Sequence, residues 1–333
     1  MNRGSGGGSS VNSDGDRAWV SELQPGGEVE ESYVVRSKDV RQRRGGGPYL
    51  ALTLGDRTGE VAALVWENVE HFSTILEVGT VVAIKGQVQR YNQRLQVVIR
   101  RAEQVAQGDV DETLYVRSSA VDVDILWRRL TSLIEEITNP HLQQLLFRIM
   151  SDPEVAQLLR VAPAARGMHH AFRSGLLEHT VSMATIGRQL AEHYSLDPDM
   201  VVTGCLLHDL GKIWELDISS SIEYTDDGRL LGHLTMEVLF VDRLIAQMDA
   251  FPDELRRQLL HILLAHHGEY EYGSPRRPKT PEALLVHMID LLDSKMAGML
   301  EAINADGDSE QPWSPYSRIL DRFIYRRRPP NDS

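Results

Sequence analysis

Seven histidines and aspartates, spread over a little more than a hundred positions, constrain this chain more than any other feature. They fall in five segments, separated by 28, 23, 32 and 22 residues. Each segment lies on or beside an apolar pattern typical of a helix. Imidazole and carboxylate groups are the ligands that hold divalent metals against a phosphate. The sequence therefore predicts a metal site in the core of a helical bundle, with these ligands: His179, His208, Asp209, His233, His266, His267 and Asp290.

The adjacent pair His208-Asp209 stands at the end of an apolar run. Its imidazole offers one directional nitrogen, and its carboxylate can bridge two metals about 3.5–4 Å apart. We expect Gly211 to let the backbone turn away and Lys212 to place an ammonium near the phosphate. Asp209 and Lys212 are therefore the predicted catalytic residues.

The interpretation rests on the set, because a single histidine beside an apolar run is more often a core or surface residue. Two further histidines, His170 and His287, are ambiguous by their neighbours. The others lack a comparable pairing and are left out: His71, His141, His169, His193 and His261.

The length of 333 residues suits two domains, and 42% hydrophobic residues suffice for sizeable cores. The single Cys205 rules out a disulfide framework and fits a reducing compartment. Because it lies in an apolar run, we expect a buried structural thiol. The sequence shows no signal peptide and no apolar stretch of membrane-spanning length. We therefore expect a cytoplasmic protein.

The net charge of −13 argues against an anionic partner, but the charge is uneven. Residues 27–110 carry 11 basic and 11 acidic residues. Since fields are screened beyond roughly 10 Å, a local basic patch can still bind phosphates. Such a patch lies within nine positions, opposed only by Asp39: Arg36, Lys38, Arg41, Arg43 and Arg44.

The chain divides by pattern into five stretches. Residues 1–26 are poor in apolar side chains and predict a disordered leader. Residues 27–110 hold five β-branched runs (30–36, 49–54, 61–66, 81–89 and 95–99) with a short helical segment near 68–76. That count predicts a small closed barrel, an OB-fold, whose open face binds single-stranded nucleic acid.

Helical periodicity follows. We expect a helical connector, or the first part of the second domain, at 111–166, an all-α metal domain at 167–305 and a polar, basic tail at 306–333. Helices should begin after Ser174, Asp197 and Thr280 and at Asp253, and Gly268 should end one of them. The fold class is thus multidomain α and β, a barrel followed by a helical bundle.

The ligand order resembles that of the HD-domain metal-dependent phosphohydrolases, through LLHDLGK (206–212) and the late Asp290. Longer strings are similar to the YhaM-type 3′–5′ exoribonucleases: GLLEHT (175–180), LGH (231–233), HHGEYEYGSP (266–275), TPEA (280–283) and DLLDSKM (290–296). Those enzymes pair an N-terminal OB-fold with an HD domain. The resemblance covers residues 27–300 and is strongest from 168 to 298.

The resemblance implies a ligand assignment. His179, His208, Asp209 and Asp290 would hold one divalent metal, and Asp209 would bridge to a second. The second would be held by His233, His266 and His267. Two metals per chain are expected, with Mn²⁺ as the first choice and Mg²⁺, Co²⁺ or Fe²⁺ as alternatives.

Aromatic and basic residues indicate where a strand would bind, since aromatic faces stack on bases and cations contact phosphates. One set follows the paired histidines: Tyr270, Tyr272, Arg276 and Arg277. The other lies in the barrel: Arg43, Arg44, Tyr49, Tyr91 and Arg94.

The expected chemistry is hydrolysis of single-stranded RNA, with single-stranded DNA as a further substrate, to nucleoside 5′-monophosphates, with metal-activated water as nucleophile. The 3′–5′ direction is implied by the resemblance alone. Two enzymatic alternatives stay open, a cyclic-dinucleotide phosphodiesterase and an HD-type nucleotide phosphohydrolase. A nucleic-acid-binding protein with a purely structural metal is a third. The oligomeric state is also open, with a homo-oligomer among the options.

Overall fold

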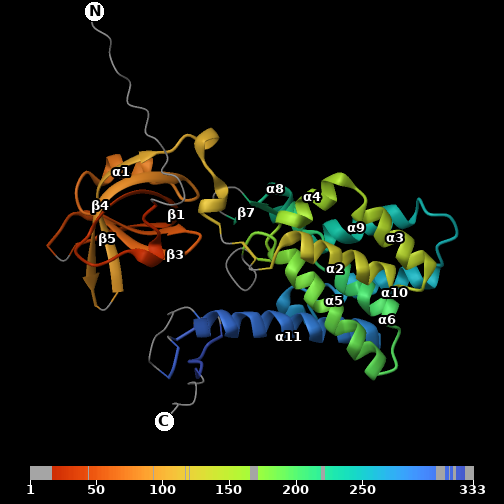
Figure 1. Cartoon of the computed structure of the whole chain (residues 1–333). Helices are drawn as coiled ribbons and strands as arrows, with labels where there is room; N and C mark the ends of the chain where they lie inside the picture. Colours follow the sequence, from red (N-terminus) through yellow and green to blue (C-terminus); the bar gives the residue numbers. More distant parts are fainter. Residues whose placement is uncertain are drawn as a thin grey trace, which may run out of the picture. The chain divides into compact units, whose positions relative to one another are not determined.

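The protein is described from a computed structural model. The described residues are 17–43, 45–92, 94–116, 118–119, 121–165, 172–218, 222–304, 312–314, 316–317 and 320–326. The chain forms two compact units, Met1–Arg117 and Ser118–Ser333, here called the barrel unit and the helical unit (Figure 1). This confirms the predicted multidomain α and β fold class.

The barrel unit is a closed five-stranded barrel in the order β1-β2-β3-β5-β4. The β3–β5 pairing that closes it is parallel, and the other pairings are antiparallel. This confirms the expected OB-fold. Its elements are β1 (Glu28–Gln42), β2 (Pro48–Asp56), β3 (Gly59–Val65), α1 (Val69–Ile75), β4 (Val81–Tyr91) and β5 (Arg94–Gln104).

Strand β1 is longer than the sequence predicts because it serves two neighbours. Its first half pairs with β4 and its second half with β2, and the register shifts between Val35 and Ser37. A second shift lies at Gly86 on β4. There a Cβ atom would lie 2.6 Å from the Val98 carbonyl oxygen, so only glycine fits. Such bulges bend strands and allow a short sheet to close.

The ordered part of the barrel unit begins earlier than expected. Within the predicted leader, Trp19, Val20 and Leu23 are buried around a short 3₁₀ turn (Val20–Glu22). The Arg17 guanidinium lies 5.0 Å from the ring centres of both Trp19 and Tyr115. A few apolar side chains are enough here because a folded barrel is present to cover them. The leader prediction for residues 1–16 concerns positions outside the described residues.

The helical unit contains α2 to α11 (Figure 1). The first three are α2 (Val123–Glu135), α3 (Pro140–Met150) and α4 (Pro153–Val161). The remainder are α5 (Gly175–His193), α6 (Pro198–Leu207), α7 (Lys212–Glu215), α8 (Asp226–Leu231), α9 (His233–Ile245), α10 (Asp253–Ala265) and α11 (Pro281–Asn304). One continuous core joins α2 to α4 with α5, α6, α10 and α11. Residues 123–161, expected in a connector, therefore share the core of the helical unit.

The helical unit also holds a two-stranded hairpin, β6 (Leu216–Ile218) with β7 (Ile222–Tyr224). The sequence did not predict it, because three-residue strands are too short to show a period. Together with α8, this hairpin connects Glu215 back to the start of α9. Among the helices within the described residues, none is both long and apolar enough to cross a membrane.

The predicted helix starts mostly hold. The Asp197 side chain accepts from two backbone N–H groups of α6, and Thr280 Oγ1 accepts from Ala283 N. Ser174 precedes α5 as expected, but it does not cap the helix with its side chain. Its Oγ donates instead to the Arg160 carbonyl (2.6 Å), and its φ of 66° is left-handed. The tertiary contact with α4 has replaced the local cap.

Candidate functional site

The seven predicted ligands come from five elements of the helical unit. His179 lies on α5, and His208 and Asp209 follow the last turn of α6. His233 is the first residue of α9. The other ligands follow α10 or lie on α11: His266, His267 and Asp290.

The structure brings these side chains together in two groups. One comprises His179, His208 and Asp290, and the other comprises Asp209, His233, His266 and His267. Within each group, one ligand atom of every member lies within 4.8 Å of the others. His208, Asp209 and His266 are almost completely buried.

Asp209 faces both groups. Its Oδ2 lies 3.2 Å from His208 Nε2 and 3.9 Å from His179 Nε2. Its Oδ1 lies 3.4 Å from His233 Nε2 and 3.6 Å from His266 Nε2. One carboxylate therefore presents one oxygen to each group, which is the geometry of a bridging ligand.

Two ligand imidazoles are held from behind by carboxylates. His179 Nδ1 lies 2.7 Å from Asp293 Oδ2, and Ser182 Oγ donates to the other oxygen of Asp293 (2.6 Å). His233 Nδ1 lies 3.0 Å from the Glu215 carboxylate, which also accepts the His233 backbone N–H. Such carboxylates fix the ring tautomer and increase the basicity of the far nitrogen.

The other three imidazoles are held by backbone carbonyls. Nδ1 of His208 lies 2.9 Å from the Cys205 oxygen, and Nδ1 of His266 lies 2.9 Å from the Leu263 oxygen. Nδ1 of His267 lies 3.0 Å from the carbonyl oxygen of Tyr272. Because a carbonyl only accepts, each Nδ1 must carry the proton. Each Nε2 therefore directs a lone pair into the site.

The donor set fits divalent cations. Among the described residues, His208 Nε2, His266 Nε2 and Asp209 Oδ1 are buried atoms without a hydrogen-bond partner. Nε2 of His233 and of His267 lie 3.3 Å apart. Since both rings carry their proton on Nδ1, this is a pair of facing lone pairs and not a hydrogen bond. Buried acceptors in this arrangement need a positive charge between them.

The titration behaviour differs between the two groups. Burial lowers the pKa of His266 to about 3 and also lowers the pKa of His267. Burial lowers the pKa of His179 as well, but Asp290 and Asp293 outweigh it and raise that pKa to about 9. The His266 and His267 imidazoles therefore favour the neutral form, whereas a cation held by His179 would compete with a proton.

Lys212 opens α7 and lies against Asp209, with its Nζ 2.6 Å from Oδ2. Burial lowers the pKa of Lys212, but Asp209 outweighs this and raises it. Burial raises the pKa of Asp209, whereas Lys212 and His208 hold it well below its usual range. Lys212 is thus an ammonium paired with the carboxylate of Asp209. Its Nζ lies against Asp209 Oδ2 and does not stand apart at a separate position for a phosphate.

Gly211 is needed for close approach and not for an unusual turn, since its φ of −57° is ordinary. A Cβ atom there would lie 2.2 Å from the His233 carbonyl oxygen. Its N–H donates to Glu237 Oε2 (3.3 Å), and Glu237 is fully buried. This contact lets α9 begin directly beside Asp209. The sequence reasoning gave no role to Glu237, Glu215 or Asp293.

The predicted loop residues lie directly after the paired histidines. Tyr270 and Tyr272 form a 3₁₀ turn and are exposed, as is Arg276. The Arg277 guanidinium lies 5.1 Å from the Tyr270 ring centre and pairs with Glu269 (2.8 Å). The Tyr272 carbonyl holds His267, so this loop is connected to a predicted ligand.

The predicted barrel residues fall at two places. Tyr91 and Arg94 are cross-strand neighbours at the β4–β5 turn, and both are exposed. Arg43 and Tyr49 meet at Trp66, which the sequence reasoning missed. Arg44 lies outside the described residues.

Of the two ambiguous histidines, His287 lies within the described residues and is in neither ligand group. His287 Nδ1 donates to the His266 carbonyl (2.7 Å), so it positions a ligand. His170, like the excluded His169, lies outside the described residues. Cys205 is fully buried, and burial raises the pKa of its thiol, as expected for a structural thiol.

Two family models match the chain. The HD domain model covers residues 176–295, which include all seven predicted ligands. A model described as an OB-fold nucleic acid binding domain covers residues 34–105. The first range runs from α5 to α11 of the helical unit, and the second covers most of the barrel.

Full-length relatives match across both units. The 3′–5′ exoribonuclease YhaM of Halalkalibacterium halodurans is 35% identical over 280 residues, 83% of this chain and 87% of that protein. The protein of the same name from Bacillus subtilis is 32% identical over 280 residues (84% and 88%). That from Shouchella clausii is 33% identical over 309 residues (91% and 96%).

Proposed function

The chain belongs to the YhaM family of 3′–5′ exoribonucleases, and we propose that it shortens single-stranded RNA from the 3′ end with two divalent cations. The products would be nucleoside 5′-monophosphates. The observation that carries the two-cation part is Asp209, whose two oxygens face two separate ligand groups. When bound, the cations would polarise the scissile phosphate and lower the pKa of a water.

The chain's own residues divide the work. His179, His208 and Asp290 would hold one cation, and His233, His266 and His267 the other, with Asp209 shared. Because every Nδ1 is already engaged, the imidazoles cannot rotate away when a cation leaves. This preorganised set would keep the position of the phosphate fixed from one cleavage to the next.

Lys212 would have two states. In the structure its ammonium neutralises Asp209 Oδ2. With a cation held by Asp209, that carboxylate would no longer need the ammonium, and Lys212 would be available to a non-bridging phosphate oxygen. The positive charge of Lys212 would stabilise the charge that grows on that oxygen in the transition state.

The 3′ end of the strand would lie along the loop after His267. Tyr270 and Tyr272 expose their rings there for stacking, and Arg276 and Arg277 lie beside them for the phosphates. The barrel unit would hold the strand further toward its 5′ side. Single-stranded DNA would bind through the same stacking and phosphate contacts, with lower preference where 2′-hydroxyls are contacted.

The function is tested by incubating the protein with Mn²⁺ and a 5′-labelled single-stranded RNA, with matched DNA, cyclic dinucleotides and nucleotides in parallel. A ladder that shortens from the 3′ end, lost in Asp209→Asn, supports the proposal. Intact RNA together with a cleaved cyclic dinucleotide contradicts it. Mg²⁺, Co²⁺ and Fe²⁺ are compared with Mn²⁺ in the same assay.

The number of cations is tested separately by metal analysis after loading and desalting. Two ions per chain are expected, and His267→Ala should reduce the count to one. One ion in both proteins contradicts the dinuclear proposal. His261→Ala is the control, because His261 accepts the Lys279 backbone N–H away from the ligand groups.

A further inference from the structure

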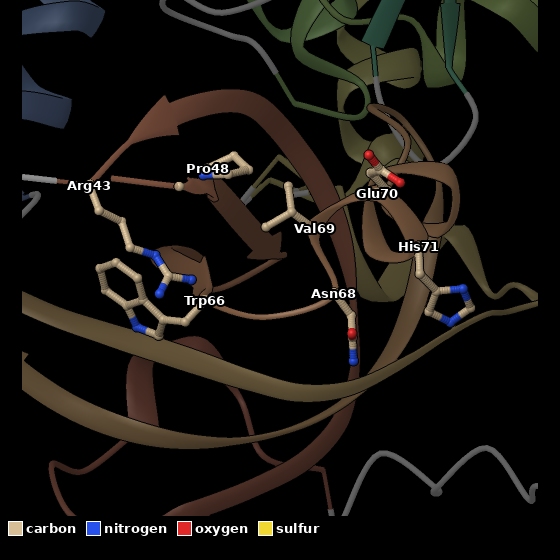
Figure 2. A pocket seen from close by; sticks show the side chains of 8 residues that line it. Arg43, Pro48, Trp66, Asn68, Val69, Glu70 and His71 are labelled. Carbon is tan, nitrogen blue, oxygen red and sulfur yellow. The ribbon is translucent and has the colours of Figure 1, made fainter. Parts of the chain in front are cut away.

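The barrel unit carries a cavity of about 500 Å³ that the metal chemistry does not use. Arg43 and Pro48 line it from the β1–β2 connection and Trp66 from the end of β3. Asn68, Val69 and His71 line it from the start of α1 (Figure 2). Cavities of roughly 300–1,000 Å³ are of the size that binds small organic groups.

One wall of the cavity is a stack of flat groups. The rings of Tyr49 and Trp66 have centres 4.9 Å apart at an angle of 27°. The Arg43 guanidinium lies 5.3 Å from the Trp66 ring centre, and Figure 2 shows it over the indole. Tyr49 is half-buried, while Trp66 is 37% exposed. Trp66 therefore presents part of its ring to the cavity that it lines.

The opposite side is mixed. Pro48 and Val69 provide apolar surface, and Asn68, Glu70 and His71 bring polar groups. Asn68 stands at the N-cap of α1, where an Asn side chain usually accepts a backbone N–H. Here it makes no such bond, so the carboxamide is not committed to capping α1. An aromatic wall with a few polar groups at the rim matches the needs of a nucleobase.

We propose that this cavity binds one unstacked nucleobase of the single-stranded RNA, with Trp66 as the stacking surface and Arg43 on the adjacent phosphate. The base would displace the Arg43 guanidinium from the indole. Within the described residues, Arg43 has no carboxylate partner, so its charge is free to meet the strand. This inference rests on the proposed function, and it adds a base-binding position that the predicted barrel contacts did not include.

The charges favour a base within a strand over a free mononucleotide. A nucleoside monophosphate carries close to two negative charges at neutral pH, whereas a phosphodiester carries one. The cavity offers one guanidinium, and the Glu70 carboxylate also lines it. A single phosphodiester charge is matched by Arg43, and a second charge would face repulsion from Glu70.

The test measures RNA binding by the full chain in EDTA, where hydrolysis cannot interfere. Fluorescence anisotropy is recorded with a labelled RNA of about 12 nucleotides, within the range of OB-fold sites. Trp66→Ala should raise the dissociation constant about 5- to 150-fold, and Trp66→Phe should retain most of the affinity. Because Trp66 is uncharged, its removal should leave the salt dependence unchanged. Arg43→Ala should instead reduce the slope of log affinity against log salt by roughly 0.7.

A set of RNAs with one abasic position each locates the base. Wild type should lose affinity when the abasic position falls on the cavity, and Trp66→Ala should be insensitive to the same change. Tyr194→Ala is the matched control, since Tyr194 is an exposed aromatic residue of the helical unit. Adenosine monophosphate is the competitor that represents a free nucleotide. Its displacement of RNA from wild type but not from Trp66→Ala would overturn the strand-bound assignment.

The outcomes separate this inference from the proposed function. Hydrolysis of a small chromogenic phosphodiester with Mn²⁺ reports whether Trp66→Ala leaves the metal site intact. If wild type shortens RNA and Trp66→Ala binds RNA equally well, the cavity assignment is wrong and the exonuclease stands. If wild type binds RNA through Trp66 but does not shorten it, the exonuclease proposal fails and the base-binding position stands.

Discussion

The carboxylates behind the ligands offer the sharpest test of the metal centre, and Asp293→Asn is the first change to make. Asparagine has the same shape, so its amide oxygen can still accept from His179 Nδ1 and its NH₂ group can donate to Ser182 Oγ. The contact of 2.7 Å with His179 is then kept, and that of 2.6 Å with Ser182 is kept with its direction reversed. The negative charge is lost.

The size of the effect follows from what that charge does. It raises the electron density on His179 Nε2, the atom that faces the cation. Loss of such an outer carboxylate typically weakens metal binding by about 10- to 100-fold. That range corresponds to about 1.4–2.7 kcal/mol of binding free energy. Because Asp293 also raises the pKa of His179, the free energy of unfolding of the metal-free variant should fall as well, so metal affinity is the quantity compared.

Isothermal titration calorimetry with Mn²⁺ should show the loss of affinity. A second variant can be compared with Asp293→Asn, because the second ligand group has its own outer carboxylate. Glu215→Gln removes the charge behind His233, with contacts of 3.0 Å. We expect Asp293→Asn to weaken one binding event and Glu215→Gln the other. The control is Asp242→Asn, which removes an equal charge from α9 where Asp242 pairs with Arg256 at the surface.

Two results would refute this reasoning. If neither variant changes either dissociation constant by more than the Asp242 control does, the carboxylates do not tune the ligands. If both variants weaken the same event, the two groups do not bind separate cations.

Three further changes test the packing around the site. Gly211→Ala should lower the free energy of unfolding by about 1–3 kcal/mol and release metal, because the new Cβ meets the His233 backbone. The control Gly108→Ala should do neither, because a Cβ at Gly108 meets nothing within 4 Å. Urea titration and metal analysis measure the two effects. Glu237→Gln should exceed wild type in free energy of unfolding by up to about 1.4 kcal/mol for each pH unit above 4.5. Burial raises the pKa of Glu237, so above this pH the unfolded chain ionises while the folded chain does not. A gain that is equal at about pH 5 and about pH 7 contradicts this prediction. Leu146→Ala should lower the free energy of unfolding by about 2–5 kcal/mol, and the loss should fall in the unfolding step that metal stabilises. Such a result would show that α3 belongs to the metal domain. A loss confined to a separate step that metal does not affect would count against this.

The clustering of the seven proposed ligands could be predicted because their chemistry is carried by residue type and chain order. Their outer partners could not. Glu215 and Asp293 are ordinary acidic residues in the sequence, and the Cys205, Leu263 and Tyr272 partners act through backbone carbonyls that every residue has. Such contacts exist only after the helices have packed.

The barrel shows the same division. Its strands were visible because β-branched runs and turn residues alternate over short distances. Trp66 was not singled out, since an aromatic residue at the end of a strand is most simply a core residue. Its exposure and its stack on Tyr49 depend on the pairing of β2 with β3 and on the preceding loop.

The order of the ligands along the chain has a consequence for the cell that makes this protein. Synthesis proceeds from the N-terminus, and domains generally fold as units in that order. The barrel unit has its own core and is finished long before Asp290 on α11 is added. Under the proposed function, a nascent chain would hold RNA before it has the complete set of proposed ligands. The message and the ribosomal RNA nearest to the growing chain would then escape cleavage until Asp290 is added.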